Sequence, residues 1–98
     1  MFLAKVLGTV VSSQKDARCQ GKKLLLIQPH ATQGDLLVPT GASMVAVDGV
    51  GAGNGSLVMY TQGSSARLTD ITRDTPIDTV IIGIVDAIEI GGRRMDTK

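Results

Sequence analysis

Two adjacent serines, Ser64 and Ser65, are the residues of this 98-residue chain that come closest to a catalytic pattern. They stand in Gly-Ser-Ser-Ala-Arg at 63–67, where a hydroxyl could attack a carbonyl carbon if a base took its proton. The only histidine, His30, stands beside Pro29 on a different predicted element, and the Gly-x-Ser-x-Gly signature is absent. We therefore predict that Ser64 caps a short helix, or that the two serines line an opening.

Metal binding needs several ligands, and the sequence offers few of them. His30 and Cys19 are the only histidine and the only cysteine, whereas zinc sites generally use three or four protein ligands. The sequence therefore predicts no metal site, and it predicts no cofactor. A single cysteine also excludes an internal disulfide framework and is consistent with a reducing compartment.

Glycines at 49, 51, 53 and 55 alternate with other residues between two short apolar runs. A dinucleotide-binding loop has its own glycine spacing and opens a helix, whereas a predicted strand follows here. Gly-Lys-Ser and Gly-Lys-Thr are absent from the sequence, which excludes a Walker phosphate loop. The pattern instead predicts a bulged turn where backbones approach closely, and Asn54-Gly55 is a hairpin signal because both residues tolerate positive φ.

Asp48 and Asp86 each follow a valine in an apolar run, so a carboxylate buried at either position needs a partner. Arg67 is the natural partner, because a guanidinium can hold a carboxylate through two parallel hydrogen bonds. We predict structural ion pairs or interface contacts for these three residues. Since neither a nucleophile nor a histidine accompanies them, the sequence predicts a building block rather than an enzyme.

The elements that carry these residues are mostly strands. Apolar and β-branched runs predict strands at 2–12, 24–27, 43–50, 56–61 and 79–90. Pro29 lacks a backbone donor, which predicts that the second strand lies at an edge, is bulged or ends there. We predict polar loops at 13–23, 31–42 and 69–76, a short helix at 63–68, and a tail at 91–98 that is frayed or lies on a neighbour.

Five short strands around one small core predict an all-β fold, with residues 1–98 as a single domain. A small OB-like β-barrel is the expected architecture, because closure removes exposed strand edges. The helix of such barrels usually lies between the third and fourth strands. A helix before the last strand is therefore a departure from the OB pattern.

Composition limits the partners of the chain. A net charge of +1 offers no large field of one sign to nucleic acid or to an anionic membrane. Lys5 and the polar residues from Ser12 onward interrupt the apolar amino terminus, so we predict neither a signal peptide nor a membrane span, and a cytoplasmic location. Apolar residues make up 43% of the chain, which exceeds what a small core can bury and predicts a homo-oligomer.

Several short segments carry a family likeness. They are Gly-Lys-Lys-Leu-Leu-Leu (21–26), Val-Ala-Val-Asp (45–48), Val-Gly-Ala-Gly-Asn-Gly (50–55), Gly-Ser-Ser-Ala-Arg (63–67), Pro-Ile-Asp (76–78) and Ile-Gly-Ile-Val-Asp (82–86). In this order they resemble the vertex proteins of bacterial microcompartment shells, the family of ethanolamine-utilisation and carboxysome pentamer proteins. Residues 28–35 and the Gly-Gly-Arg-Arg tail depart from the family pattern.

The resemblance implies a five-stranded barrel that assembles as a homopentamer in a bacterial microcompartment shell. It also implies a place at the fivefold corners, beside hexameric shell proteins whose flat sheets cannot close without pentagons. The motifs resemble those of catabolic compartments more than those of carboxysomes, which implies a catabolic shell. A pentamer has a central axis, and the candidates to line that axis or a pore are Gly51, Ala52, Gly53, Gly63, Ser64 and Ser65.

The alternative function is an OB-type nucleic-acid-binding module. Such modules stack bases on aromatic side chains and follow the phosphates with a basic groove. Phe2 and Tyr60 are the only aromatic residues and the chain is nearly neutral, which disfavours this function. A third class, an enzyme or small-ligand binder, lacks a usable catalytic constellation.

Overall fold

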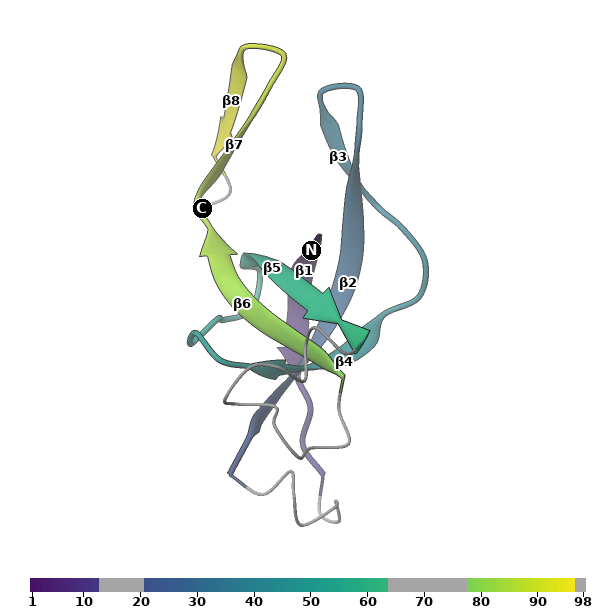
Figure 1. Cartoon of the computed structure of the whole chain (residues 1–98), viewed down its shortest axis with the longest axis vertical. Helices are drawn as coiled ribbons and strands as arrows, with labels where there is room; N and C mark the ends of the chain where they lie inside the picture. Colours follow the sequence, from purple (N-terminus) through teal and green to yellow (C-terminus); the bar gives the residue numbers. More distant parts are fainter. Residues whose placement is uncertain (13–20, 64–77, 97–98) are drawn as a thin grey trace.

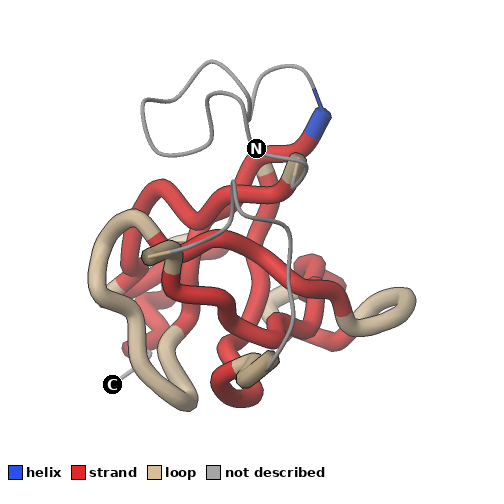
Figure 2. Tube along the Cα trace, turned by 90° about the horizontal axis from the view of Figure 1, so that it is seen from below, coloured by secondary structure: helices blue, strands red, loops and turns tan. Residues whose placement is uncertain are grey.

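The computed structural model describes residues 1–12, 21–63 and 78–96, and these residues fold mainly into β-strands (Figures 1 and 2). The alternation and β-branched content of the sequence favour this outcome. The strands are β1 (Phe2–Thr9), β2 (Lys23–Gln33), β3 (Leu36–Pro39), β4 (Met44–Asp48), β5 (Leu57–Gln62), β6 (Thr79–Val85), β7 (Ala87–Ile90) and β8 (Arg93–Asp96).

Five of the strands in the described part of the chain close into a barrel. They follow one another as β1, β5, β6, β4 and β2, and β2 then pairs with β1 to complete the circle. The pairs are antiparallel except for β4 and β6, which run parallel. Closure leaves these strands without a free edge, and the predicted five-stranded barrel is confirmed.

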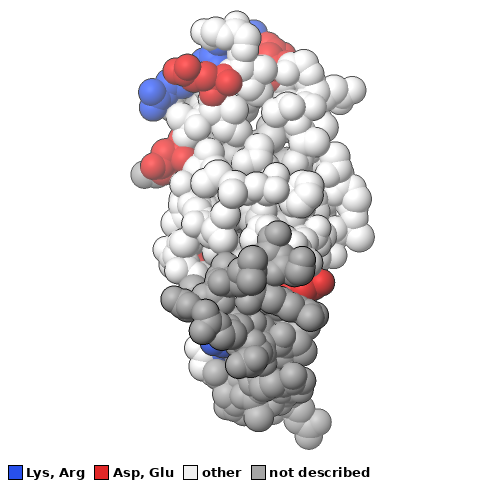
Figure 3. All heavy atoms as spheres, in the orientation of Figure 1, with Lys and Arg blue, Asp and Glu red and all other residues white. Residues whose placement is uncertain are grey.

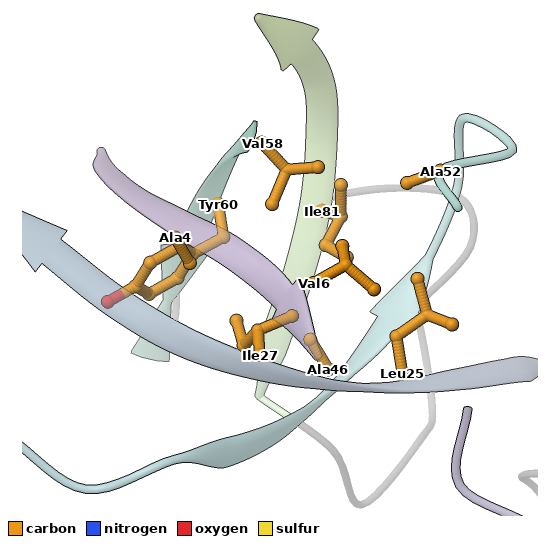
Figure 4. Close-up of a cluster of buried hydrophobic side chains, with 9 residues drawn as sticks. All are labelled: Ala4, Val6, Leu25, Ile27, Ala46, Ala52, Val58, Tyr60 and Ile81. Carbon is orange, nitrogen blue, oxygen red and sulfur yellow. The ribbon is translucent and has the colours of Figure 1, made fainter. Parts of the chain in front are cut away.

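Side chains that alternate along the strands fill the inside of the barrel. Figure 4 shows them converging from all five barrel strands. Each large aliphatic side chain removed from water contributes about 1.5–3 kcal/mol to folding, so this small core supplies much of the stability. The buried cluster consists of Ala4, Val6, Leu25, Ile27, Ala46, Ala52, Val58, Tyr60 and Ile81.

A second buried cluster lies on the opposite, outer face of the same wall. Leu24 on β2, Val47 on β4 and Val80 on β6 are 8%, 1% and 1% exposed, with Val10 and Ile82 packed against them. Since neighbouring residues of a strand point to opposite faces, the wall formed by β2, β4 and β6 is apolar on both sides. The four consecutive apolar residues at 24–27 are typical of a strand that packs on both faces.

The prediction of a loop over 31–42 is wrong, because residues 31–39 belong to a hairpin. β2 continues through Pro29 to Gln33 and turns back as β3, with Ala31 opposite Val38. The Pro29 carbonyl accepts a hydrogen bond from the Thr40 amide at 2.8 Å. Pro29 lies at the point along β2 where the pairing with β4 has ended and the pairing with β3 begins. Pro29 has no amide hydrogen to donate in return, and the Thr40 carbonyl accepts from Gln28 Nε2 at 3.0 Å instead, so the strand continues through this position.

The predicted strand at 79–90 is two strands. β6 ends at Val85 and β7 begins at Ala87, where the chain leaves the barrel and pairs only with β8. The tail, predicted to be frayed or to lie on a neighbour, instead supplies β8 within the same chain, and Gly91 and Gly92 form the turn at φ +59° and +82°. The β7–β8 hairpin (Ala87–Asp96) and the β2–β3 arm (His30–Pro39) project from the same end of the barrel (Figure 1).

Two further predictions meet different outcomes. Asn54-Gly55 does form a turn, but β4 and β5 on either side of it do not pair, so the expected hairpin is wrong. β5 instead pairs with β1 on one side and with β6 on the other, so the barrel gives it a ladder on both edges. The helix predicted at 63–68 lies, apart from Gly63, outside the described residues.

Candidate functional site

Asp48 organises the loop that links β4 to β5. Its carboxylate accepts hydrogen bonds from the amides of Val50 and Gly51 at Oδ1, 3.0 and 3.2 Å away, and from Ala52 at Oδ2, 3.0 Å away. The Asp48 side chain is 1% exposed, so these donors replace the water that a buried carboxylate would otherwise need. The chemistry is that of a structural anchor.

Lys23 is the charged partner of Asp48 in the described part of the chain. The two residues stand directly opposite each other in the β2–β4 ladder, and Lys23 Nζ lies 3.7 Å from Asp48 Oδ2. The same ammonium donates a hydrogen bond to the Ala52 carbonyl at 3.1 Å. Arg67, the partner predicted from the sequence, lies outside the described residues.

The glycine loop is held to β1 as well as to Asp48. The Gly55 amide donates to the Val6 carbonyl, and the Val6 amide donates to the Ser56 carbonyl, both at 2.9 Å. Gly55 has φ +81°, a conformation that an L-residue with a side chain adopts only at a cost. The loop is therefore a fixed part of the barrel rather than a phosphate-binding loop that waits for a ligand.

The candidate axis residues are in different environments. Gly51 and Gly53 are exposed, whereas Ala52 is 1% exposed and its side chain joins the barrel core. Gly63 has φ +73° and donates its amide hydrogen to the Asp78 carbonyl at 2.9 Å. Ser64 and Ser65 lie outside the described residues.

The remaining chemistry-bearing residues do not assemble into a reactive site. Asp86 is exposed at the junction of β6 and β7, and His30 Nδ1 lies 2.8 Å from the Gln28 carbonyl, to which it donates. Cys19 falls outside the described residues. Among residues 1–12, 21–63 and 78–96, no three His, Cys, Asp or Glu side chains gather as a metal site would require. Nor does this part contain a helix of the length and hydropathy that crosses a bilayer.

Tyr60, one of the two aromatic residues, is buried inside the fold. Tyr60 is 3% exposed, and its ring lies with its centroid 5.5 Å from that of Phe2. Burial raises the pKa of the Tyr60 hydroxyl above its ordinary value of 10.0. The buried ring of Tyr60 is not available for base stacking, which removes one of the two aromatic platforms a nucleic-acid-binding barrel would use.

Two hollows of modest size lie on the surface that the structure describes. One, of about 300 Å³, separates the β2–β3 arm from the β7–β8 hairpin and is lined by Leu36, Ile90 and Met95 together with Asp35, Arg93 and Arg94. Arg93 and Asp35 bridge this gap at 2.6 Å. The other, of about 270 Å³, lies between residues 54–57 and 84–86. Neither contains a pair of groups arranged for acid–base catalysis.

Sequence reasoning expected open apolar surface on the outer faces of the first and last predicted strands, and the structure places such surface on β1 and on β4. Leu7 and Val45 are 51% and 40% exposed, although they stand in strands whose inward neighbours are fully buried. On the face shown in Figure 3, charged side chains gather over the arms, and much of the middle is uncharged. Strand register could have located this surface, because it decides which residues of adjacent strands share a face.

Comparison with known proteins adds a family to this geometry. Residues 1–86 match the family model described as "Ethanolamine utilisation protein EutN/carboxysome". The bacterial microcompartment shell vertex protein GrpN of Rhodospirillum rubrum is 45% identical over 89 residues, which cover 91% of this chain and 97% of GrpN. The carboxysome shell vertex protein CcmL of Gloeobacter violaceus is 40% identical over 98 residues, 100% of this chain and 95% of CcmL.

Solved structures agree with the sequence matches. CcmL of Nostoc superposes with a TM-score of 0.86 at 38% identity, with 100% of both chains covered. The GrpN pentameric microcompartment shell protein of Rhodospirillum rubrum superposes with a TM-score of 0.75 at 44% identity, over 91% of this chain and 98% of GrpN. The barrel described above is thus similar to theirs along nearly its whole length.

Proposed function

Since this chain belongs to the EutN/CcmL family of bacterial microcompartment shell vertex proteins, we propose that five copies of it form a ring that fills the fivefold vertices of such a shell. The family is structural, and no catalytic role is attached to it. The observation that carries the proposal is the near full-length match, in sequence and in fold, to a shell protein described as pentameric.

The physical character of the surface supports assembly. A ring of identical subunits repeats one head-to-tail contact, so each copy needs two different patches that fit each other. The barrel wall carries open apolar side chains of the kind that such contacts bury, Leu7 and Val45 among them. A barrel without free edges also resists uncontrolled strand pairing, which suits a subunit that must stop at a closed ring.

We infer that the shell is that of a catabolic microcompartment rather than a carboxysome. Identity to the microcompartment vertex proteins GrpN and PduN is 45% and 47%, against 40% and 41% for CcmL of Gloeobacter and Synechocystis. EutN of Salmonella typhimurium, another bacterial microcompartment shell vertex protein, is 38% identical, so the inference rests on GrpN, PduN and the closer resemblance of the motifs. Co-expression with hexameric shell proteins of each type would separate the two, because the vertex must fit its own tile.

Gly51 and Gly53 remain candidates to line the central axis, together with Gly63, Ser64 and Ser65. Gly51 and Gly53 are exposed and lie on a loop that Asp48 and β1 hold in place. Because Gly51 and Gly53 have no side chains and the loop is held in place, an opening that they line would keep a constant width. Ala52 would contribute only its backbone, since its side chain is buried.

The proposed function is tested by mass and by shape. Native mass spectrometry of the purified chain should give a dominant species of five copies. Co-expression with a hexameric shell protein should then give closed particles in electron micrographs, whereas the hexamer alone should give sheets, tubes or open shells. A chain that stays monomeric, or forms a ring of another order, would contradict the proposal.

A further inference from the structure

One open apolar patch crosses three strands on the outside of the barrel. Leu26 on β2 stands opposite Val45 on β4 in one ladder and opposite Gly8 on β1 in the other, where the bulged residue Leu7 adjoins it. Leu7 and Val45 are 51% and 40% exposed, and Leu26 is half-buried. We call these three residues the Val45 stripe.

The Val45 stripe continues a surface that the chain already buries. Leu24 and Leu26 share the outer face of β2, and Val45 and Val47 share that of β4. Leu24 and Val47 are nevertheless only 8% and 1% exposed, as parts of the second buried cluster. The outer face of β2 and β4 is thus apolar in its buried part and in its open part. An open apolar patch of this kind is typical of a surface that binds another protein.

A second apolar patch lies on the outer face of β1, β5 and β6. Leu3 stands opposite Met59, and Met59 stands opposite Gly83. The Met59 side chain lies over Gly83, because its methyl carbon is 2.6 Å from the point where a Cβ on that residue would stand. Leu3 and Met59 are half-buried. We call these three residues the Met59 stripe.

The two stripes sit on different walls of the barrel. β2 is the central strand of the first, β5 is the central strand of the second, and both strands flank β1. Lys5, exposed on β1, stands between them and marks their boundary with a charge. Each stripe consists only of uncharged residues, as in the desolvated centre of a subunit contact.

We propose that the Val45 stripe of one copy docks on the Met59 stripe of a second copy of this chain. This rests on the proposed function, because a closed ring needs two unlike, complementary patches on every subunit. A contact of each stripe with itself would build a twofold pair and could not generate a ring of odd order. The occupant of either stripe is therefore another barrel of the same sequence, turned about the ring axis.

Site-specific cross-linking tests the proposal. In a Cys19→Ser background, Val45→Cys and Met59→Cys chains are prepared separately, mixed under conditions that allow subunit exchange, and treated with a short bis-maleimide. The mixture should give covalent dimers, and the chain with both substitutions should give a ladder that ends at five. Each single variant alone should give none. Cross-links within Val45→Cys alone, or no cross-links in rings of five, would overturn the proposal.

A charge placed on the stripe gives a second, independent test. Val45→Asp should weaken the ring by at least about tenfold in dissociation constant, because a carboxylate would be desolvated at the contact. Its circular dichroism should match that of the parent, since Val45 is partly exposed in the single chain. Val11→Asp, which places the same charge on a residue 90% exposed and outside both stripes, is the matched control and should leave the ring intact.

The two tests separate this proposal from the proposed function. If the parent chain forms no ring of five, the proposed function is wrong, and with it the docking of the two stripes. If the parent forms such rings and Val45→Asp leaves them unchanged, the function stands and the docking of the two stripes is wrong.

Discussion

Asp48 shows how one side chain can fix a loop of small residues. Its two carboxylate oxygens hold three consecutive amides, and Lys23 closes the arrangement from the neighbouring strand. The sequence predicted that a buried aspartate here needs a partner. It could not identify Lys23, because their contact depends on the β2–β4 register, which brings residues 23 and 48 face to face.

Removing the Asp48 carboxylate should destabilise the barrel measurably. Asp48→Ala leaves the three loop amides without a hydrogen-bond acceptor and should lower the free energy of unfolding by about 2–4 kcal/mol. Asp48→Asn keeps one acceptor oxygen and should cost less. Asp35→Ala, at the exposed pair with Arg93, is the control and should cost less than about 1 kcal/mol in urea titrations. Equal losses for the two alanine variants would refute the anchoring role.

Gly55 and Gly53 form a matched pair for testing backbone strain. Gly55 has φ +81°, whereas Gly53 lacks a positive φ, and a Cβ would have open space at both. Gly55→Ala should therefore cost about 1–2 kcal/mol through the left-handed conformation alone. Gly53→Ala should stay within about 0.5 kcal/mol of the parent. Thermal unfolding of both variants measures the difference, and a smaller loss at Gly55 would exclude the strain.

Tyr60 should make the folded state less stable at alkaline pH. Burial raises the pKa of its hydroxyl above 10.0, so the unfolded state releases this proton at lower pH than the folded state does. The contribution of Tyr60 is therefore fully present below about pH 10 and is lost as pH rises through the folded pKa. Tyr60→Phe should reduce this loss in urea titrations between neutral and alkaline pH. An unchanged pH profile would show that other groups cause it.

At the scale of elements, sequence patterns located strands well and their partners poorly. Phe2–Thr9, Met44–Asp48 and Leu57–Gln62 fall within or near their predicted ranges, because alternation and β-branching are local properties. β3 was missed since Gly34, Pro39 and Gly41 indicate turns. The break at Asp86 was missed since the apolar run continues across it, and only the pairing of β7 with β8 reveals the change of sheet.

The β7–β8 hairpin should be dispensable for folding of the barrel. It forms its own two-stranded sheet, and the exposed Arg93–Asp35 pair links it to the turn of the β2–β3 arm. A chain that ends at Asp86 should keep its circular dichroism and lose no more than about 1 kcal/mol of stability. A chain that ends at Gly83 is the control and should not fold, because β6 then loses its pairing with Leu57 and Val58. Unfolding of the first chain would show that the hairpin belongs to the folding unit.

At the scale of the whole molecule, the proposed ring is held by apolar surface rather than by charge. Raising sodium chloride to about 1 M should therefore leave the ring assembled, since screening acts on exposed charges. Cooling to near freezing should weaken it, because hydrophobic stabilisation falls at low temperature. Mass photometry at low protein concentration can follow both changes. Dissociation by salt would show that charged contacts hold the ring.

The placement of both arms at one end of the barrel has a consequence for any assembly with rotational symmetry. A rotation cannot turn a subunit upside down, so every copy in such a ring presents its arms to the same side. The ring therefore has two unlike surfaces, one of which bears the arms. A reporter attached beyond the last strand would therefore mark only the surface that bears the arms. The difference between the two surfaces of the ring would follow directly from the fold of one chain.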